Sequence, residues 1–284
     1  MRVYSRGMTL VLLTGATRGI GQAAAVELAR EGAEVALVGR DPQRVAAVAR
    51  EARAAGGGAP VHEHVADLLL MSEVRRLAAE ALERYERIDV LATNAGALFA
   101  TRQVTAEGLE RTFALNHLAP FLLTSLLRER LGGGRVVTTA SDAHKGARLD
   151  LDDLQCEHGY AAMRAYGASK LCNVLFTREL ARRAPELRAN CFHPGVVRTG
   201  FGKNENGVWK VATTLAGPFF RSPARGARSL VWLALSPAAG GLTGEYVQDE
   251  KAIAPSAQAQ DPILAEGLWE RSEQLAGLSA GAPA

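Results

Sequence analysis

The chain has 284 residues, of which 48% are hydrophobic and 22% charged, with a formal net charge of +3 at pH 7. This composition is ordinary for a globular protein and excludes a mostly disordered chain. The basic residues form no cluster of the kind that binds nucleic acid, so we expect no nucleic-acid partner. The three cysteines lack metal-ligand spacing, which predicts no metal site and free thiols in a reducing compartment, the cytoplasm.

Short apolar runs alternate with amphipathic segments along most of the chain. Buried strands are expected at residues 9–14, 34–39, 61–66, 88–93, 135–140 and 187–192, with a short seventh at 244–247. Helices are expected at residues 20–31, 42–55, 72–85, 107–131 and 165–183, and Pro120 should bend or divide the fourth. This alternation predicts one α/β domain, a doubly wound parallel sheet of about seven strands with helices on both faces.

The domain should cover residues 9–276, because no linker interrupts the pattern. Residues 1–8 are expected to form an N-terminal extension, and the small residues of 277–284 a flexible tail. Residues 200–223 are weakly periodic, which predicts a substrate lid, the alternative being a variable surface segment. No apolar run reaches the ~20 residues of a membrane span, and residues 1–7 lack the apolar stretch of a signal peptide, so no membrane attachment is expected.

A glycine-rich segment, TGATRGIG at residues 14–21, joins the first expected strand to the first helix. Its glycines allow the backbone to turn sharply and to approach a pyrophosphate, while the helix N-terminus offers free N–H groups to the anion. The segment therefore predicts a dinucleotide site of the Rossmann type. The residues expected to contact the dinucleotide here are Gly15, Thr17, Arg18, Gly19, Ile20 and Gly21.

The end of the second expected strand distinguishes NAD from NADP. An acidic residue there would bind the ribose 2′-hydroxyl of NAD, but this chain has Arg40. The guanidinium of Arg40, with that of Arg18 as a second candidate, would pair with the 2′-phosphate of NADP. Asp41 argues against this preference, although an N-cap role before Pro42 accounts for it. We therefore expect NADP(H), with NAD(H) as the alternative.

Of the five tyrosines, only Tyr166 is followed four residues later by a lysine, Lys170. On a helix this spacing places both side chains on one face. A neighbouring ammonium would lower the pKa of the phenol, which could then exchange a proton with a carbonyl or alcohol oxygen. By itself, such a pair is more often a surface pair on a helix than a catalytic one.

Further motifs occur in the order and on the elements typical of one family. They are NAG at residues 94–96, Asn116 in FALNH, Ser141, and HPG at residues 193–195. From residue 9 to about 247, the chain resembles the short-chain dehydrogenase/reductase family. Within that family it is most similar to the branch of the retinol dehydrogenases and the WW-domain oxidoreductase, through the runs LNHLAPFLLT and YGASKLCNVLFTREL.

The resemblance implies a role for each motif. Tyr166 would be the general acid/base, and Lys170 would lower its pKa and bind the nicotinamide ribose. Ser141 would hold the substrate oxygen, and Asn116 would hold a water molecule linked to Lys170. Without the resemblance, Ser141 and Asn116 read as a turn serine and a surface amide. The further cofactor contacts that it implies are Asp67, Leu68, Asn94, Ala95, Gly96, Pro194, Gly195, Val197 and Thr199.

These roles imply an NADP(H)-dependent carbonyl reductase or alcohol dehydrogenase, acting on a small, partly apolar ketone or secondary alcohol. The alternatives are an epimerase or dehydratase that shares the tyrosine and lysine, and a non-catalytic NADP-binding sensor or interaction protein. The resemblance also implies a homodimer or homotetramer. Ala140 stands where the family often has a second serine, and His144 is expected to be structural. The chain lacks the apolar anchor of membrane-bound relatives, so retinoid substrates are not carried over.

Overall fold

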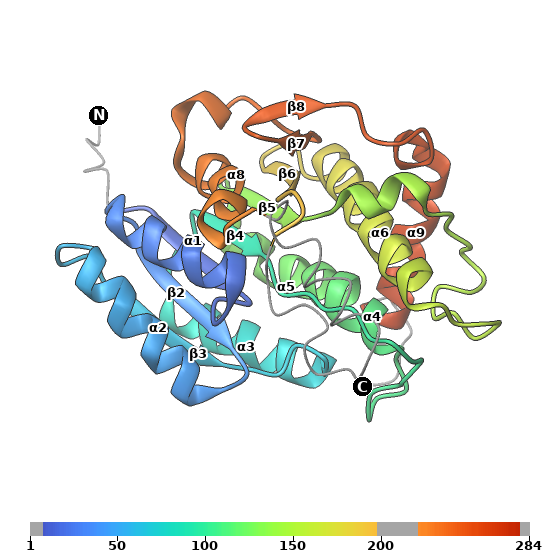
Figure 1. Cartoon of the computed structure of the whole chain (residues 1–284), viewed down its shortest axis with the longest axis horizontal. Helices are drawn as coiled ribbons and strands as arrows, with labels where there is room; N and C mark the ends of the chain where they lie inside the picture. Colours follow the sequence, from blue (N-terminus) through green and yellow to red (C-terminus); the bar gives the residue numbers. More distant parts are fainter. Residues whose placement is uncertain (1–7, 198–220, 279–284) are drawn as a thin grey trace.

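The computed structural model describes residues 8–197 and 221–278 (Figure 1). Its centre is an eight-stranded sheet with the order β3-β2-β1-β4-β5-β6-β7-β8. The strands are β1 (Leu10–Thr14), β2 (Glu34–Gly39), β3 (Val61–Val65), β4 (Val90–Thr93), β5 (Arg135–Thr139), β6 (Arg188–His193), β7 (Tyr246–Gln248) and β8 (Lys251–Ile253). Neighbouring strands are parallel except β7 and β8. The predicted single α/β domain is confirmed, with one strand more than expected.

The additional strand is β8, which pairs with β7 as a hairpin. The two strands are joined by Asp249 and Glu250, whose φ angles are positive, 49° and 63°. Positive φ at both central residues gives the two-residue turn that matches strand twist, and Asn-Gly or Asp-Gly is its usual sequence. An Asp-Glu pair carries no such signal, which is why the sequence did not indicate this hairpin.

Helices cover both faces of the sheet and create two hydrophobic cores. One core lies under α1 (Gly19–Arg30), α2 (Pro42–Ala55) and α8 (Pro223–Leu235). The other lies under α3 (Met71–Arg84), α4 (Arg111–Phe113), α5 (Ala119–Leu127), α6 (Ala162–Arg183) and α9 (Pro262–Leu275). Figure 1 shows α8 beside α1 and α9 beside α6, as their contacts require. Along β1, Leu12 belongs to one core and Leu13 to the other, so an all-apolar strand is buried on both sides.

Three α-helices of the described residues begin with the same signal, a capping side chain followed by proline. Asp41 accepts hydrogen bonds from the N–H groups at the start of α2, as expected from the sequence. Ser222 and Asp261 cap α8 and α9 in the same way, each before a proline. The sequence analysis placed no helix at either position, although the Asp41 pattern would have found both.

The helix predicted over residues 107–131 begins later and is divided. Glu107 is not helical, because its carboxylate accepts the N–H groups of Met71 and Ser72 at the start of α3. The helix starts after Glu110 and passes through a π-helical turn, Ala114–Leu118, before α5. Pro120 has no N–H group and lies at the start of α5, so the predicted division there is confirmed.

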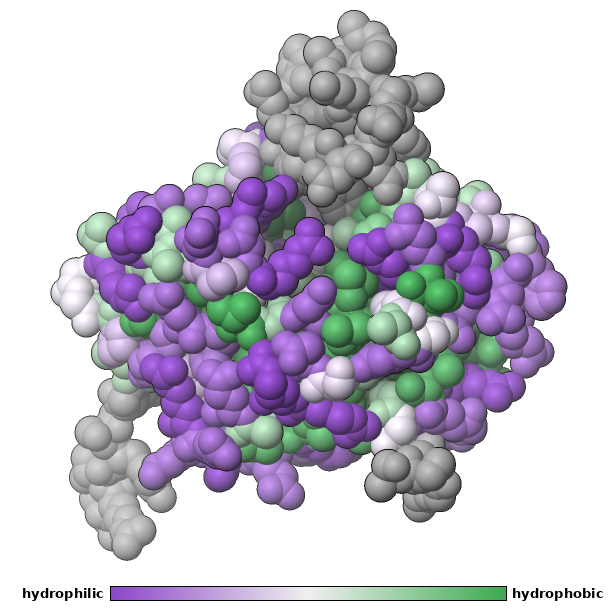
Figure 2. All heavy atoms as spheres, turned by 90° about the horizontal axis from the view of Figure 1, so that it is seen from below, coloured by the Kyte–Doolittle hydropathy of each residue, from purple (hydrophilic) through white to green (hydrophobic). Residues whose placement is uncertain are grey.

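Among the described residues, no helix is both long enough and apolar enough to cross a bilayer. Figure 2 shows one face of the molecule, on which hydrophobic residues form small groups between hydrophilic ones. Isolated apolar groups of this kind are normal on a globular protein.

Trp269 packs α9 against the rest of the domain. Its ring centroid lies 5.0 Å from that of Phe121 and 6.0 Å from that of Phe176, and the Arg183 guanidinium lies 4.9 Å from it. We expect Trp269→Ala to lower the free energy of unfolding by about 3–5 kcal/mol, measured by urea denaturation. Ile263→Ala is the control, since this side chain on the same helix is 80% exposed and should cost less than about 0.5 kcal/mol. Equal losses would show that α9 is not packed in this way.

Candidate active site

The predicted site residues follow the carboxyl ends of neighbouring strands. The glycine segment follows β1, residues 94–96 follow β4, Ser141 lies just beyond β5, and residues 194–197 follow β6. Because β1, β4, β5 and β6 are consecutive and parallel, these ends meet at one edge of the sheet. The order of the strands reverses between β1 and β4, the position where open α/β sheets bind ligands.

The glycine segment lies directly on the chain that follows β4. Gly15 has a φ of +65°, and a Cβ atom there would be 2.7 Å from Ala95 Cα. A Cβ atom at Gly21 would be 2.1 Å from the carbonyl oxygen of Gly15. Neither position can hold a side chain without moving backbone, so these two glycines are required by the close approach itself.

Asn94 holds this approach in place. Its Nδ2 donates to the carbonyl oxygens of Thr14 (3.2 Å) and Gly15 (3.3 Å), and its Oδ1 accepts from Thr139 Oγ1 (3.2 Å). Thr14 Oγ1 in turn accepts the N–H groups of Asn94 and Ala95. Both ends of the Asn94 amide are therefore used within the protein. The sequence analysis included Thr14 in the glycine segment without giving it a role, and it did not name Thr139, which is an ordinary strand residue in the sequence pattern.

The N-terminus of α1 offers an anion site. Arg18 is its N-cap residue, and no side chain caps the first N–H groups. Arg40 is exposed and forms no ion pair with any described carboxylate. The neighbouring Asp41 accepts the N–H groups of Gln43 and Arg44 and pairs with the Arg44 side chain, and these contacts hold its pKa below the usual range. Asp41 is thus occupied as a helix cap.

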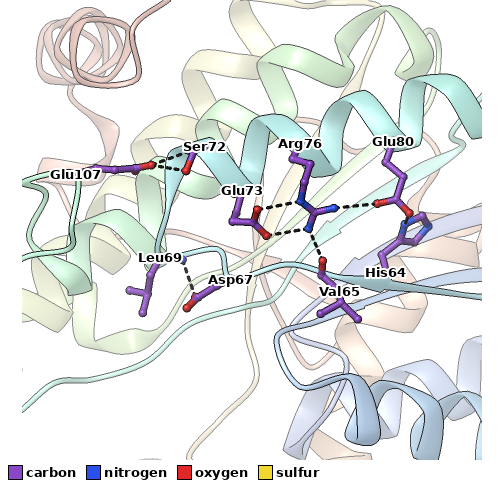
Figure 3. A network of polar contacts seen from close by, with 9 residues as sticks. All are labelled: His64, Val65, Asp67, Leu69, Ser72, Glu73, Arg76, Glu80 and Glu107. Atoms are coloured by element: carbon purple, nitrogen blue, oxygen red, sulfur yellow. Dashed lines mark hydrogen bonds and ion pairs between the residues drawn. The ribbon is translucent and has the colours of Figure 1, made fainter.

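A polar network fixes the end of β3, where Asp67 was predicted to contact the cofactor (Figure 3). Arg76 donates to the carbonyl oxygen of Val65 (2.5 Å) and to both oxygens of Glu73. Glu73 also accepts the backbone N–H of Asp67, and both this bond and the Arg76 pair lower the pKa of Glu73. Asp67 Oδ1 accepts a hydrogen bond from the N–H of Leu69 (3.2 Å), and Asp67 Oδ2 takes no part in that bond.

Helix α6 brings Tyr166 and Lys170 to one face, as predicted. Lys170 Nζ lies 5.7 Å from the centroid of the Tyr166 ring and donates to the carbonyl oxygen of Thr139 (2.9 Å). A hydrogen bond joins the side chains of Tyr166 and Ser141. Gly167 makes this proximity possible, because a Cβ atom there would be 2.9 Å from the backbone of the turn that Ser141 begins.

Asn116 lies near Lys170 and is fully buried. Its Nδ2 donates to Ala97 O and Ser169 Oγ (both 2.9 Å), and its Oδ1 accepts from Ala97 N (2.8 Å). A Cβ atom on Gly96 would be 3.2 Å from Asn116 Oδ1 and 3.4 Å from Lys170 Nζ. The structure therefore brings all four predicted catalytic side chains together, with Gly96 between two of them.

Burial dominates the proton affinities of the tyrosine and lysine. It raises the pKa of Tyr166 to about 12, while the hydrogen bond with Ser141 opposes this increase. It also lowers the pKa of Lys170 to about 8. The sequence analysis expected the ammonium to lower the pKa of the phenol, and this expectation is wrong here because desolvation outweighs other effects. Near neutral pH the site therefore holds a protonated phenol beside a lysine that is close to titrating.

The chain beyond β6 contacts the start of α1. Gly195 has a φ of +81°, and a Cβ atom there would be 2.5 Å from the side chain of Arg221. A Cβ atom on Gly226 would be 2.7 Å from Val197 and 3.2 Å from Ile20, so these two predicted contact residues lie close together. Thr199 and residues 200–220 of the predicted lid lie outside the described residues.

The remaining predicted residues are accounted for as follows. Leu68 is buried just after β3, and Pro194 is half-buried just after β6. His144 is fully buried, and its Nδ1 donates to Ser141 O (2.7 Å) while its Nε2 accepts from Ser256 N (3.1 Å). Both ring nitrogens are therefore used, which agrees with a structural role. The described residues contain no group of His, Cys, Asp and Glu that could hold a metal ion.

Comparison with known proteins places this arrangement in a family. A family model described as short chain dehydrogenase matches residues 9–207. The chain belongs to the short-chain dehydrogenase/reductase family of oxidoreductases, as its motifs indicated.

Two curated relatives match nearly the whole chain. A candidate daunorubicin C-13 ketoreductase from Streptomyces is 47% identical over 270 residues, covering 94% of this chain and 92% of the relative. Retinol dehydrogenase 13 from Homo sapiens is 37% identical and covers 95% of this chain and 85% of that protein. The similarity to the retinol dehydrogenase branch is thus confirmed.

Solved structures give the same result. An uncharacterized protein from Mycobacterium paratuberculosis superposes with a TM-score of 0.78 at 33% identity, covering 97% of this chain and 95% of that one. An alcohol dehydrogenase from Thermococcus sibiricus, complexed with 5-hydroxy-NADP, has a TM-score of 0.67 at 25% identity and covers 85% of this chain and 95% of that one.

Proposed function

We propose that this protein is an NADP(H)-dependent carbonyl reductase, which in reverse acts as an alcohol dehydrogenase on a secondary alcohol. The observation that carries the proposal is the convergence of Ser141, Tyr166 and Lys170 beyond β5. A phenol hydrogen-bonded to a serine, with a buried lysine beside it, is an arrangement suited to moving a proton to or from a substrate oxygen.

The glycine segment, the uncapped start of α1 and Arg40 fit a dinucleotide. Gly15 and Gly21 allow the close backbone approach that shapes the glycine segment, and the N–H groups at the start of α1, which no side chain caps, would face an anion. The bound dinucleotide would supply or accept the hydride. NADP is favoured over NAD because Arg40 has no described acidic partner and Asp41 is occupied as a cap. The complex of the Thermococcus relative with 5-hydroxy-NADP supports the same preference.

In the direction of reduction, Tyr166 donates its phenolic proton to the substrate oxygen. A pKa of about 12 keeps the phenol protonated at neutral pH, which is the form that a proton donor requires. The hydroxyl of Ser141 holds the same oxygen and stabilises the charge that develops on it. Lys170, positioned by Thr139 and next to Asn116, provides a positive charge that favours the resulting tyrosinate.

The substrate class is a small-molecule ketone. The Streptomyces relative named as a candidate C-13 ketoreductase covers almost the entire chain, which supports carbonyl reduction as the reaction. The three cysteines are free thiols, which supports a reducing compartment such as the cytoplasm. No specific observation favours an epimerase, a dehydratase or a non-catalytic sensor.

The general acid is tested by Tyr166→Phe. We expect ketone reduction to fall by about 100-fold or more, since proton transfer is lost while ring packing is kept. NADPH binding, followed by nicotinamide fluorescence, should be unchanged. Tyr85→Phe is the matched control, because Tyr85 hydrogen-bonds His64 on the far side of the domain and should leave turnover unaffected. Full activity in the Tyr166 variant would refute the mechanism.

The pH dependence follows from Lys170. Burial lowers its pKa to about 8, so its charge is present below that pH and lost above it. We expect kcat/KM for ketone reduction to fall about tenfold per pH unit above about pH 8. Tyr166 remains protonated over this range and does not contribute to the loss. Initial rates measured at constant ionic strength test this, and a flat profile to about pH 10 would contradict it.

Cofactor choice is tested by Arg40→Ala. Loss of a charge-assisted contact with the 2′-phosphate should raise the dissociation constant for NADPH by about tenfold or more and leave that for NADH nearly unchanged. Arg50→Ala, an exposed arginine on α2, is the control. Equal losses for both dinucleotides would rule out this role for Arg40.

A further inference from the structure

A chain of buried polar groups leads from Lys170 to the C-terminal helix. The carbonyl oxygen of Thr139 accepts two hydrogen bonds, one from Lys170 Nζ (2.9 Å) and one from Asn173 Nδ2 (3.2 Å). His117 follows Asn116 in the π-helical turn and is fully buried, with its Nε2 2.9 Å from Ser272 Oγ on α9. None of these contacts beyond Lys170 has a part in the mechanism above.

Two atoms of this chain of groups have no hydrogen-bond partner. Among the described residues, His117 Nδ1 and Asn173 Oδ1 are the buried side-chain atoms left unpaired. The two side chains belong to neighbouring parts of the core, since the His117 ring centroid lies 6.2 Å from that of Phe176, which follows Asn173 by three residues on α6. The pKa of His117 reflects the same neighbour: burial lowers it, and Asn173 opposes that effect. If His117 carries its proton on Nε2, both unpaired atoms are acceptors, and each is left without a donor at a substantial cost.

The other tautomer allows both atoms to be satisfied at once. A proton on His117 Nδ1 can be donated to Asn173 Oδ1 when a side-chain adjustment brings the two atoms to hydrogen-bonding distance, while Nε2 accepts from the Ser272 hydroxyl. That hydroxyl now lies 2.7 Å from Leu268 O, and it can donate to only one of the two acceptors. The balance of hydrogen-bond donors and acceptors around the ring therefore favours the tautomer protonated on Nδ1.

We propose that His117 carries its proton on Nδ1 and, with Asn173, positions Lys170 through the carbonyl group of Thr139. The hydrogen bonds then run in one direction, from Ser272 to His117, from His117 to Asn173 and from Asn173 to Thr139. Such a chain fixes the orientation of the Asn173 amide, so that its N–H group rather than its oxygen faces Thr139. This proposal depends on the proposed function, because it assigns the two residues a purpose only if Lys170 acts there.

The placement of Asn173 and His117 is suited to positioning Lys170. Asn173 follows Lys170 by three residues and Tyr166 by seven, so all three lie along one face of α6. Burial lowers the pKa of His117 to about 4, so the ring stays neutral at working pH and the tautomer persists. Without the donor on His117, the amide of Asn173 can rotate and its N–H group no longer bonds the carbonyl oxygen of Thr139. That oxygen then no longer holds the Lys170 ammonium in one orientation.

The first experiment separates positioning from stability. His117→Phe fits the aromatic surroundings, since Phe113 and Phe176 lie 5.2 and 6.2 Å from the His117 ring. Asn173→Leu removes the donor to Thr139. We expect each variant to lower kcat by about tenfold or more, with a much smaller change in KM for the ketone. Thr177→Val is the control, since its buried hydroxyl bonds the backbone carbonyl oxygen of Asn173 and not the amide side chain that belongs to this chain of groups.

The double variant, His117→Phe with Asn173→Leu, decides between the two explanations. It leaves no unpaired polar atom between the two positions, so its free energy of unfolding should recover relative to the singles. If these residues position Lys170, kcat stays low although stability returns. Recovery of kcat together with stability, or wild-type kcat in Asn173→Leu, would overturn the proposal.

The second experiment needs no turnover. Nitrogen NMR of the ¹⁵N-histidine-labelled protein should show a protonated Nδ1 and an unprotonated Nε2 for His117. The opposite assignment would overturn the proposed tautomer. The Lys170 side-chain signal should also shift in Asn173→Leu and not in Thr177→Val, and an unchanged signal would refute the coupling. If the wild-type protein reduces no ketone, the proposed function fails, whereas these spectra still test the hydrogen-bonded chain.

Discussion

The site depends on the close approach of two backbone segments at the edge of the sheet between β1 and β4. The glycine segment after β1 touches residues 94–96 so closely that Cβ atoms at Gly15 and Gly21 would meet backbone atoms within 3 Å. Asn94 and Thr14 hold the two segments together through hydrogen bonds in both directions. This contact places the N-terminus of α1 beside the end of β4, close to the proposed catalytic side chains.

A second requirement is the burial of polar groups around Lys170. The lysine is 3% exposed and Asn116 is fully buried, an arrangement that is costly unless every group has a partner. Thr139 O and the residues around Gly96 provide those partners and leave little freedom of movement. The same burial that fixes the geometry also lowers the pKa of Lys170 and raises that of Tyr166. Geometry and proton affinity in this site therefore have one physical cause.

Much of the fold followed from local patterns. The strands of the parallel sheet are continuous apolar runs because they are buried on both faces, and this is the pattern that the sequence displays. The start of α2 followed from Asp41 and proline for an equally local reason. The β7–β8 hairpin did not, since its Asp-Glu turn has an unusual sequence. The extent of the helix near Asn116 could not be predicted from local patterns either, because Glu107 hydrogen-bonds the start of α3, which is distant in sequence.

The sequence by itself determined the residue types and spacings of the site: the glycines after the first strand, and a tyrosine and a lysine on one helical face. These depend on local geometry, namely the turn after a strand and the 3.6-residue period of a helix. Only the tertiary structure decided how the groups act on one another. That Thr139 holds Lys170, that desolvation rather than the ammonium controls the pKa of Tyr166, and that polar atoms of His117 and Asn173 are buried without a partner all depend on contacts between distant segments. Solvent is excluded from these groups only when the whole domain is packed, so the sequence of a single segment cannot predict it.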